Sequence, residues 1–276
     1  MPLGRRAKIQ RKSPPQLELM RAAGLVVAGA LSAVRAVVRP GVSTGELDRV
    51  AEAYIRGQGA VPSFLGYQGF PASICASVNE QVVHGIPRRE QRLADGDVVS
   101  IDCGAIVDGF HGDAAITVPV GDVAPELLEL IRVTEDSLWA GLARARVGGR
   151  LSDISHAIAH SLSDHEHAYG IVRNYGGHGI GTEMHQEPHL LNYGKPGRGP
   201  KLVAGMALAV EPMVTLGDPD TDELSDGWTV VSRDGSVAAH AEHTVAVTAD
   251  GPWVLTAVDG GASRLAGFAS GSAARG

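Results

Sequence analysis

The sequence predicts a single α+β domain, because pairs of helical segments alternate with groups of short β-rich runs along one chain. The helical segments are expected at residues 14–38, 43–56, 125–146 and 151–165. Strands follow each pair, which indicates a duplicated plan, although no sequence repeat accompanies it. No linker divides the middle of the 276 residues, so we expect residues 13–258 to form one domain.

End signals place the first pair of helices. The first helix is expected to begin after Ser13, with proline in its first turn, and to stop before Pro40. Ser43 and Glu46 have the spacing of a capping box at the start of the second helix. The uncharged run 22–34 is shorter than the roughly 20 residues that a bilayer requires, so we expect a buried helix and no membrane span.

Short apolar runs bounded by turn residues predict the strands. They lie at 74–78, 98–103, 114–120, 171–174, 206–214, 228–232, 239–248 and 253–257. The dipeptides Asp95-Gly96 and Asp108-Gly109 are typical of tight turns between such strands.

The two ends of the chain differ from this pattern. Residues 1–12 predict a flexible basic arm, and residues 259–276, rich in Gly, Ala and Ser, predict a disordered tail. The basic residues of the arm are Arg5, Arg6, Lys8, Arg11 and Lys12.

Composition and motif spacing exclude several classes of protein. A net charge of −7 argues against a nucleic-acid-binding body, and the two cysteines form no CxxC motif of a zinc ribbon or thioredoxin. There is no HExxH zinc helix and no P-loop. Residues 41–45 match the GxSxG nucleophile pattern, but a helix precedes them instead of a strand, so Ser43 is interpreted as a helix cap.

A pair of aspartates marks the first candidate site. If Asp108-Gly109 closes a two-residue hairpin, Asp102 faces Ala115 across the ladder and Asp113 lies two residues away. Both carboxylates then point to the same face of the sheet. Two carboxylates aimed into one space repel unless a proton or a cation lies between them, which favours a metal site.

The second half of the chain offers comparable groups. His178 lies in a glycine-dense segment, Glu211 follows an apolar run, and Glu242 opens another apolar strand. Each alone could be a solvent-facing strand end or an ion-pair partner, whereas together they strengthen the case for a metal centre.

These segments resemble the type I methionine aminopeptidases of the pita-bread metallopeptidase family. The matching stretches are 77–80 with 84–87, 101–102 with 108–113, 177–181 with His185, 211–213, and 242–244. The similarity covers roughly residues 13–258, and the order and spacing of the motifs are more specific than any one of them. It implies an antiparallel sheet covered by two helix pairs that are related by pseudo-twofold symmetry.

The resemblance also implies two divalent metal ions. Their ligands would be Asp102, Asp113, His178, Glu211 and Glu242. In that pattern Asp113 and Glu242 bridge the ions, Asp102 binds one of them, and His178 and Glu211 bind the other. Oxygen-rich ligation with one imidazole suits Mn, Fe, Co or Zn and does not choose among them.

The resemblance further implies the catalytic and substrate-binding residues. A hydroxide held between the two metal ions would attack the first peptide carbonyl, and Glu211 would move the proton toward the leaving amine. His185 would contact the carbonyl or the tetrahedral intermediate, and His84 the scissile nitrogen. The methionine pocket would include Tyr67, Phe70, Cys75 and Trp228, with Met184 and Phe64 nearby and Phe64 interpreted as core packing.

We therefore expect a cytoplasmic, monomeric aminopeptidase that removes the initiator methionine from nascent polypeptides when the second residue is small. The chain's own start, Met1-Pro2, would be such a substrate. The basic arm offers a transient contact with the ribosome. Two alternatives stay open: an X-Pro aminopeptidase or prolidase of the same fold, which carries an additional N-terminal domain, and a non-catalytic protein that binds ribosomes or peptides.

Overall fold

The computed structural model describes residues 9–270, with side chains to residue 268. Its helices are α1 (Pro14–Val37), α2 (Thr44–Gly57), α3 (Pro125–Leu142), α4 (Leu151–Ser163) and α5 (Ala262–Ser270), with one 3-10 turn, η1 (Tyr67–Gly69). The four helices expected from the sequence are therefore confirmed. The capping box of α2 is also present, because the Glu46 carboxylate accepts from Ser43 N–H at 2.9 Å and Glu46 N–H donates to Ser43 Oγ at 3.2 Å.

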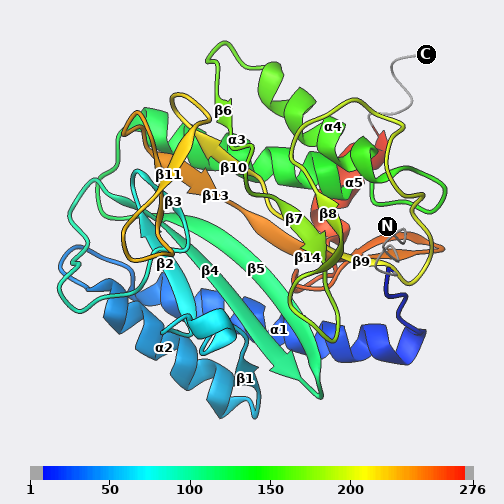
Figure 1. Cartoon of the computed structure of the whole chain (residues 1–276), viewed down its shortest axis with the longest axis horizontal. Coiled ribbons are helices and arrows are strands. Elements are labelled where there is room, and N and C mark those ends of the chain that lie inside the picture. Colours follow the sequence, from blue (N-terminus) through cyan, green and yellow to red (C-terminus); the bar gives the residue numbers. More distant parts are fainter. Residues whose placement is uncertain (1–8, 271–276) are drawn as a thin grey trace, which may run out of the picture.

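A nine-stranded antiparallel sheet forms the centre of the molecule (Figure 1). Along its main path lie β1 (Val61–Pro62), β4 (Val98–Val107), β5 (Phe110–Pro119), β14 (Glu242–Thr248), β9 (Ala207–Val210), β7 (Gly177–Gly179) and β8 (Gln186–Leu190). Off this path, β2 (Ile74–Val78) pairs with β4, and β15 (Gly251–Val254) pairs with β14. The first and second halves of the chain thus meet where β5 pairs with β14.

Two small sheets complete the strands that the structure describes. One contains β13 (Ala238–His240), β10 (Met213–Thr215) and β6 (Gly170–Ile171). The other contains β11 (Thr221–Glu223), β12 (Val230–Ser232) and β3 (Gln81–Val83).

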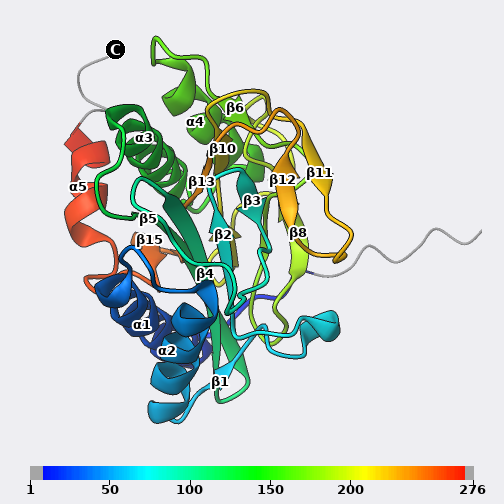
Figure 2. The ribbon, with the colours of Figure 1, turned by 90° about the vertical axis from the view of Figure 1, so that its left-hand side faces the viewer.

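The two helix pairs pack on the sheet as the resemblance implied (Figures 1 and 2). Helices α1 and α2 lie against β2, β4 and β5, whereas α3 and α4 lie against β8, β10, β13 and β14. In β4 the odd-numbered Ile101 and Cys103 face the first helix pair, and in β14 Val245 and Val247 face the second. Because side chains alternate along a strand, the even-numbered positions of both strands are left for the opposite face.

Helix α1 is long and apolar enough to cross a membrane by length and composition. Packing accounts for that apolar character, because Met20, Ala23, Val27 and Val34 have no exposed surface. A helix with such a buried stripe is typical of the core of a globular domain.

Most predicted strands are present with altered ends. The predicted strand at 206–214 is broken at Glu211-Pro212, because proline has no N–H to donate to a ladder. The predicted strand at 239–248 is likewise divided, since Ala241 N–H donates to Pro212 O at 3.2 Å. Several short strands had no recognisable pattern in the sequence; they are β1, β3, β7, β8 and β11.

The predicted flexible arm is wrong for residues 9–12, and residues 1–8 lie outside the described part of the chain. Lys12 N–H donates to Gly205 O at 2.7 Å, and Arg11 Nε donates to Ala204 O at 3.0 Å. The Lys12 side chain is buried, with Nζ 3.3 Å from Gln10 O. Backbone and side-chain contacts to the body therefore order this segment.

The predicted disordered tail is also wrong up to the end of α5, whereas residues 271–276 lie outside the described residues. Asp259 caps this helix by accepting from the N–H groups of Gly261 and Ser263, both at 2.9 Å. Arg264 then ties α5 to α3 through Asp136, with a nitrogen–oxygen distance of 3.0 Å. The Gly-, Ala- and Ser-rich composition of this segment did not indicate a helix, although the helix is capped by Asp259 and packs on α3.

Candidate active site

Strand register brings the two aspartates of the first half together. Within the β4–β5 hairpin, Val107 pairs with Phe110 and Asp102 pairs with Ala115, which confirms the register expected from the Asp108-Gly109 turn. Asp113 lies two residues before Ala115 and therefore on the same face of the sheet. Asp102 and Asp113 line the same cavity.

The strand pairing continues from this hairpin into strands from the second half of the chain. Ala115 pairs on its other side with Glu242 of β14, so Glu242 shares the face of the two aspartates. In the next row, His178 of β7 pairs with Ala209 of β9, and Ala209 pairs with Thr244 of β14. Glu211, two residues beyond Ala209, completes the set.

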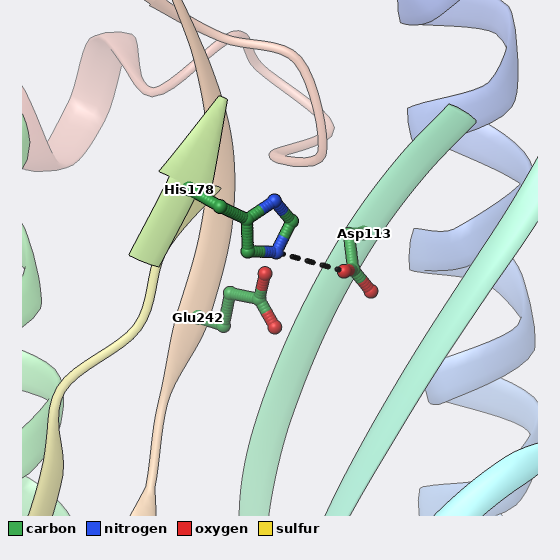
Figure 3. A group of neighbouring side chains, drawn as sticks. All are labelled: Asp113, His178 and Glu242. Atoms are coloured by element: carbon green, nitrogen blue, oxygen red, sulfur yellow. Dashed lines mark ion pairs between the residues drawn. The ribbon is translucent and has the colours of Figure 1, made fainter. Parts of the chain in front are cut away.

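All five metal-ligand candidates thus converge on one point of the sheet. His178 Nε2 lies 3.9 Å from Asp113 Oδ2 and 3.5 Å from Glu211 Oε1. Figure 3 shows the ring of His178 reaching from β7 toward Asp113 on β5, with the Glu242 carboxyl from β14 beside it. Donor atoms of Asp113, His178 and Glu242 lie within 4.8 Å of one another, a spacing suited to a metal ion.

The carboxyl groups lack the partners that buried charges require. Among the described residues, Asp102 Oδ1, Asp113 Oδ1 and Glu242 Oε1 are buried without a hydrogen-bond partner. Burial raises the pKa of Asp102 to about 7. Burial and the neighbouring carboxylates raise the pKa values of Asp113 and Glu242 well above the ordinary range, and burial does the same for Glu211. Divalent cations would reverse both penalties, so the residues present fit a metal centre.

His178 has the neutral form and the tautomer that metal binding requires. Its Nδ1–H donates to Gly179 O at 3.0 Å, which leaves the Nε2 lone pair facing the carboxylates. Burial lowers the pKa of His178 to about 3, so the ring is neutral near pH 7.

A pocket of about 190 Å³ includes the acid cluster in its lining and has apolar and aromatic walls next to it. Its lining includes every residue that the resemblance placed in substrate binding, namely Tyr67, Phe70, Cys75, His84, His185 and Trp228. Phe70 and Trp228 meet edge to face with ring centroids 5.0 Å apart. Met184 and Phe64 line the same pocket, and Phe64, at 8% exposure, also packs in the adjoining core as expected.

The two histidines expected to contact substrate lie at the pocket's border with a wider groove of about 1200 Å³. His185 Nδ1 lies 2.7 Å from Tyr67 Oη, and the His185 ring is 4.3 Å from that of His178. His84 has a left-handed φ of 60°, and burial lowers its pKa to about 4. A strained backbone conformation of a non-glycine residue often accompanies a functional position.

Three supporting residues were missed by sequence reasoning. His240 of β13 has its Nε2 3.7 Å from Glu211 Oε2, and burial lowers the pKa of this ring to about 3. Asn192 Nδ2 donates to Glu211 O at 2.9 Å, which holds the backbone where β9 ends. Thr244 Oγ1 donates to Asp113 O at 2.8 Å and accepts from Asp113 N–H at 3.1 Å. Only His240 carried a signal: it lies two residues before Glu242, so strand alternation would have placed both on one face.

Comparisons with known proteins first identify the wider fold. Prolidase from Pyrococcus furiosus aligns with a TM-score of 0.72 at 19% identity, over 90% of this chain and 65% of that chain. At this identity the likeness shows a shared fold and no more.

More similar proteins identify the family and the group within it. The model of metallopeptidase family M24 matches residues 18–249. Methionine aminopeptidase 1 of Mycobacterium tuberculosis is 56% identical over 92% of this chain and 96% of the relative, and methionine aminopeptidase of Clostridium acetobutylicum is 51% identical over 89% and 97%. The crystal structure of methionine aminopeptidase from Rickettsia prowazekii aligns with a TM-score of 0.88 at 42% identity, over 91% of this chain and 100% of that chain. The chain therefore belongs to metallopeptidase family M24 and, within it, to the methionine aminopeptidases.

Proposed function

We propose that this chain cleaves the N-terminal methionine from polypeptides whose second residue is small, using a centre of two divalent metal ions. One observation carries the proposal: buried carboxylate oxygens without partners open directly onto a small apolar pocket. The cluster can bind cations, and the pocket offers apolar and aromatic walls for an unbranched thioether side chain.

Asp102, Asp113, His178, Glu211 and Glu242 would hold the ions, with Asp113 and Glu242 proposed as the residues shared between them. Four carboxylates balance the charge of two divalent cations. The identity of the metal is proposed only as a class, Mn, Fe, Co or Zn, because one imidazole among oxygen ligands does not choose among them. When bound, such ions polarise water and the peptide carbonyl.

The remaining steps fall to side chains of the chain itself. Glu211 accepts a proton from the attacking water and returns it to the leaving amine. The Tyr67 hydroxyl, 2.7 Å from His185 Nδ1, can donate to that atom and thereby leave His185 Nε2–H for the carbonyl oxygen. His84 lines both the pocket and the groove, which suits a contact with the scissile nitrogen.

The wider groove accounts for the rest of the substrate. Its lining includes His178 and Glu211 of the cluster, residues 174–176, 182–183 and 185–187, and Ile9, Gln10 and Arg11. A polypeptide with methionine in the pocket can leave the site through this groove.

The decisive experiment measures methionine release from Met-Ala-Ser before and after chelation, with each divalent metal added back in turn. We expect activity to vanish with chelator and to return with at least one of the four metals. Release from an X-Pro peptide instead of Met-Ala-Ser would support the prolidase alternative. Peptide binding without any release would support the non-catalytic one.

The cellular setting is proposed with the same substrates. We propose a cytoplasmic monomer that acts on nascent polypeptides. A ribosome contact would rely on Arg5, Arg6 and Lys8, because Arg11 already bonds Ala204 O and Lys12 is buried. Substituting the first three by glutamine should weaken co-sedimentation with ribosomes and leave tripeptide hydrolysis unchanged.

A further inference from the structure

His240 lies beside the metal cluster and has no role in the ligand set. Its side chain is 1% exposed, and its Nε2 is buried without a hydrogen-bond partner among the described residues. Donor atoms of Glu211, His240 and Glu242 lie within 4.8 Å of one another. Buried polar atoms usually have a hydrogen-bond partner, so His240 Nε2 is expected to interact with the neighbouring carboxylates.

The backbone of His240 is fixed without help from its ring. Its N–H donates to Thr117 Oγ1 at 2.9 Å, and its carbonyl accepts from Thr117 Oγ1 at 2.8 Å. Ser100 Oγ lies 2.8 Å from the same hydroxyl. Since Ser100 pairs with Thr117 two residues from the row of Asp102 and Ala115, the central hairpin holds His240 in register with the metal cluster.

Glu211 lies between two imidazoles. Its Oε1 is 3.5 Å from His178 Nε2, and its Oε2 is 3.7 Å from His240 Nε2. His178 has its N–H committed to Gly179 O, so the His178 lone pair and Glu211 Oε1 could together hold an ion. Among the residues that the structure describes, His240 is the side chain positioned to donate to the Oε2 side.

We propose that His240 is a positioning residue that donates its Nε2–H to Glu211 Oε2 and so orients the carboxylate for the ion shared with His178. This inference rests on the proposed dinuclear centre. The 3.7 Å approach is longer than a hydrogen bond, so the proposal requires the carboxyl to turn toward Nε2 when the ion is bound. A donor that bonds a metal-binding side chain in this way orients that side chain and raises metal affinity without touching the metal.

The test compares metal affinity in three forms of the full-length apoprotein. Isothermal titration with Mn²⁺ is expected to show two ions bound by the unaltered chain. His240→Gln keeps an N–H donor at a similar reach and should retain both affinities within about threefold. His240→Leu removes the donor and should weaken one ion by about tenfold or more, while the other stays within about threefold.

A matched control comes from the other face of the same region. His243 lies next to Glu242 but points toward Trp139, with its Nδ1 2.8 Å from Thr256 Oγ1. His243→Leu removes a partly buried imidazole next to the same ligand, so it should lower the melting temperature and leave both Mn²⁺ affinities within about threefold of the unaltered chain.

Two outcomes would overturn the proposal. Unchanged affinities in His240→Leu would show that the ring does not act on Glu211, and equal losses in Gln and Leu variants would make His240 a direct ligand. Long-range ¹H–¹⁵N spectra of the Zn²⁺-loaded unaltered chain provide a second measurement that does not depend on the folding of a variant. A protonated His240 Nε2 supports the proposal, and a metal-bound His240 Nε2 refutes it. If the unaltered chain binds no metal, the dinuclear centre itself fails.

Discussion

The two halves of the molecule position their proposed metal ligands in different ways. Asp102 and Asp113 come from one hairpin, whose unbroken ladder runs from Val98–Pro119 to Val107–Phe110. His178 and Glu211 come from β7 and from the residue after β9, strands of 3 and 4 residues. A long ladder fixes side chains by register alone, whereas short strands need additional contacts to hold theirs.

Those additional contacts are present in the second half. Asn192 holds the carbonyl of Glu211, Gly179 O fixes the ring of His178, and His240 faces the Glu211 carboxylate. Thr244 joins the halves, because its hydroxyl bonds both backbone groups of Asp113 where β14 passes β5. The first half therefore positions its side chains by strand register, and the second half by these additional contacts.

The largest expected effect comes from removing the carboxylate of Asp113 from the β4–β5 hairpin. Asp113→Asn should abolish tight Mn²⁺ binding and lower kcat/KM by more than about a thousandfold, because a bridging carboxylate is lost. The metal-free variant should be at least as stable as the unaltered chain at pH 7.5, since one buried like charge has gone.

The control for this substitution lies at the tip of the same hairpin. Asp108 is exposed at a φ of 47°, a conformation that asparagine tolerates, so Asp108→Asn should keep activity and metal binding within about twofold. Methionine release and Mn²⁺ titration measure both variants. An active Asp113→Asn enzyme in metal-replete buffer would contradict the proposed centre.

The next largest effect concerns thermal stability. Bound metal should raise the melting temperature of the protein, and this increase should become larger as pH rises. The folded pKa values of the clustered acids lie above the unfolded values of about 4, so their protonated forms stabilise the metal-free protein only at low pH. That stability is lost as pH rises toward and beyond the folded pKa of about 7 for Asp102. Metal ions bind the ionised forms, so the gap in melting temperature between loaded and chelated protein should widen from pH 5 to pH 8.

At pH 7.5 and a hundredfold excess of metal over Kd, the gap should reach about 5–10 °C. Differential scanning calorimetry of matched loaded and chelated samples measures it. A gap that stays constant or narrows with rising pH would show that these acids are not the metal ligands.

The contrast between the halves also explains what the sequence could predict. The turn Asp108-Gly109 has a recognised signature, so the pairing of Asp102 with Ala115 could be worked out by counting residues. Strand β7 gave no pattern because its glycines are required by close neighbours: a Cβ on Gly177 would lie 2.2 Å from Ala209 O. His240 could have been placed on the face of Glu242 by counting two residues along the predicted strand, but its approach to Glu211 depends on tertiary structure. Local rules therefore predicted the hairpin ligands, whereas the supporting contacts depend on tertiary structure.

A moderate effect is expected at the junction of the halves. Thr244→Val keeps the side-chain shape but leaves the buried N–H and carbonyl of Asp113 without their partner, which should cost about 1–3 kcal/mol of unfolding free energy. Metal affinity should fall severalfold, because Asp113 is no longer held against β14.

Thr248→Val provides the comparison on the same strand. Its hydroxyl donates to Gly251 O at 2.7 Å in a half-buried position away from the cluster. This variant should lose less stability and retain full metal affinity. Denaturant unfolding and Mn²⁺ titration distinguish the two, and equal metal affinities would show that the junction does not set the position of Asp113.

The smallest effect concerns a single hydrogen bond at the substrate side. Tyr67→Phe removes the hydroxyl that lies 2.7 Å from His185 Nδ1 but keeps the ring contact, with centroids 5.3 Å apart. The loss of one such bond is worth about 0.5–1.5 kcal/mol, so kcat should fall about threefold to tenfold while KM for Met-Ala-Ser changes little. Tyr193→Phe, in a hollow formed with residues 168–171 and 217–219, should leave both constants unchanged. A Tyr67→Phe enzyme that loses affinity for the peptide without losing turnover would place Tyr67 in the pocket wall alone, because an oriented His185 matters only once the carbonyl begins to gain charge.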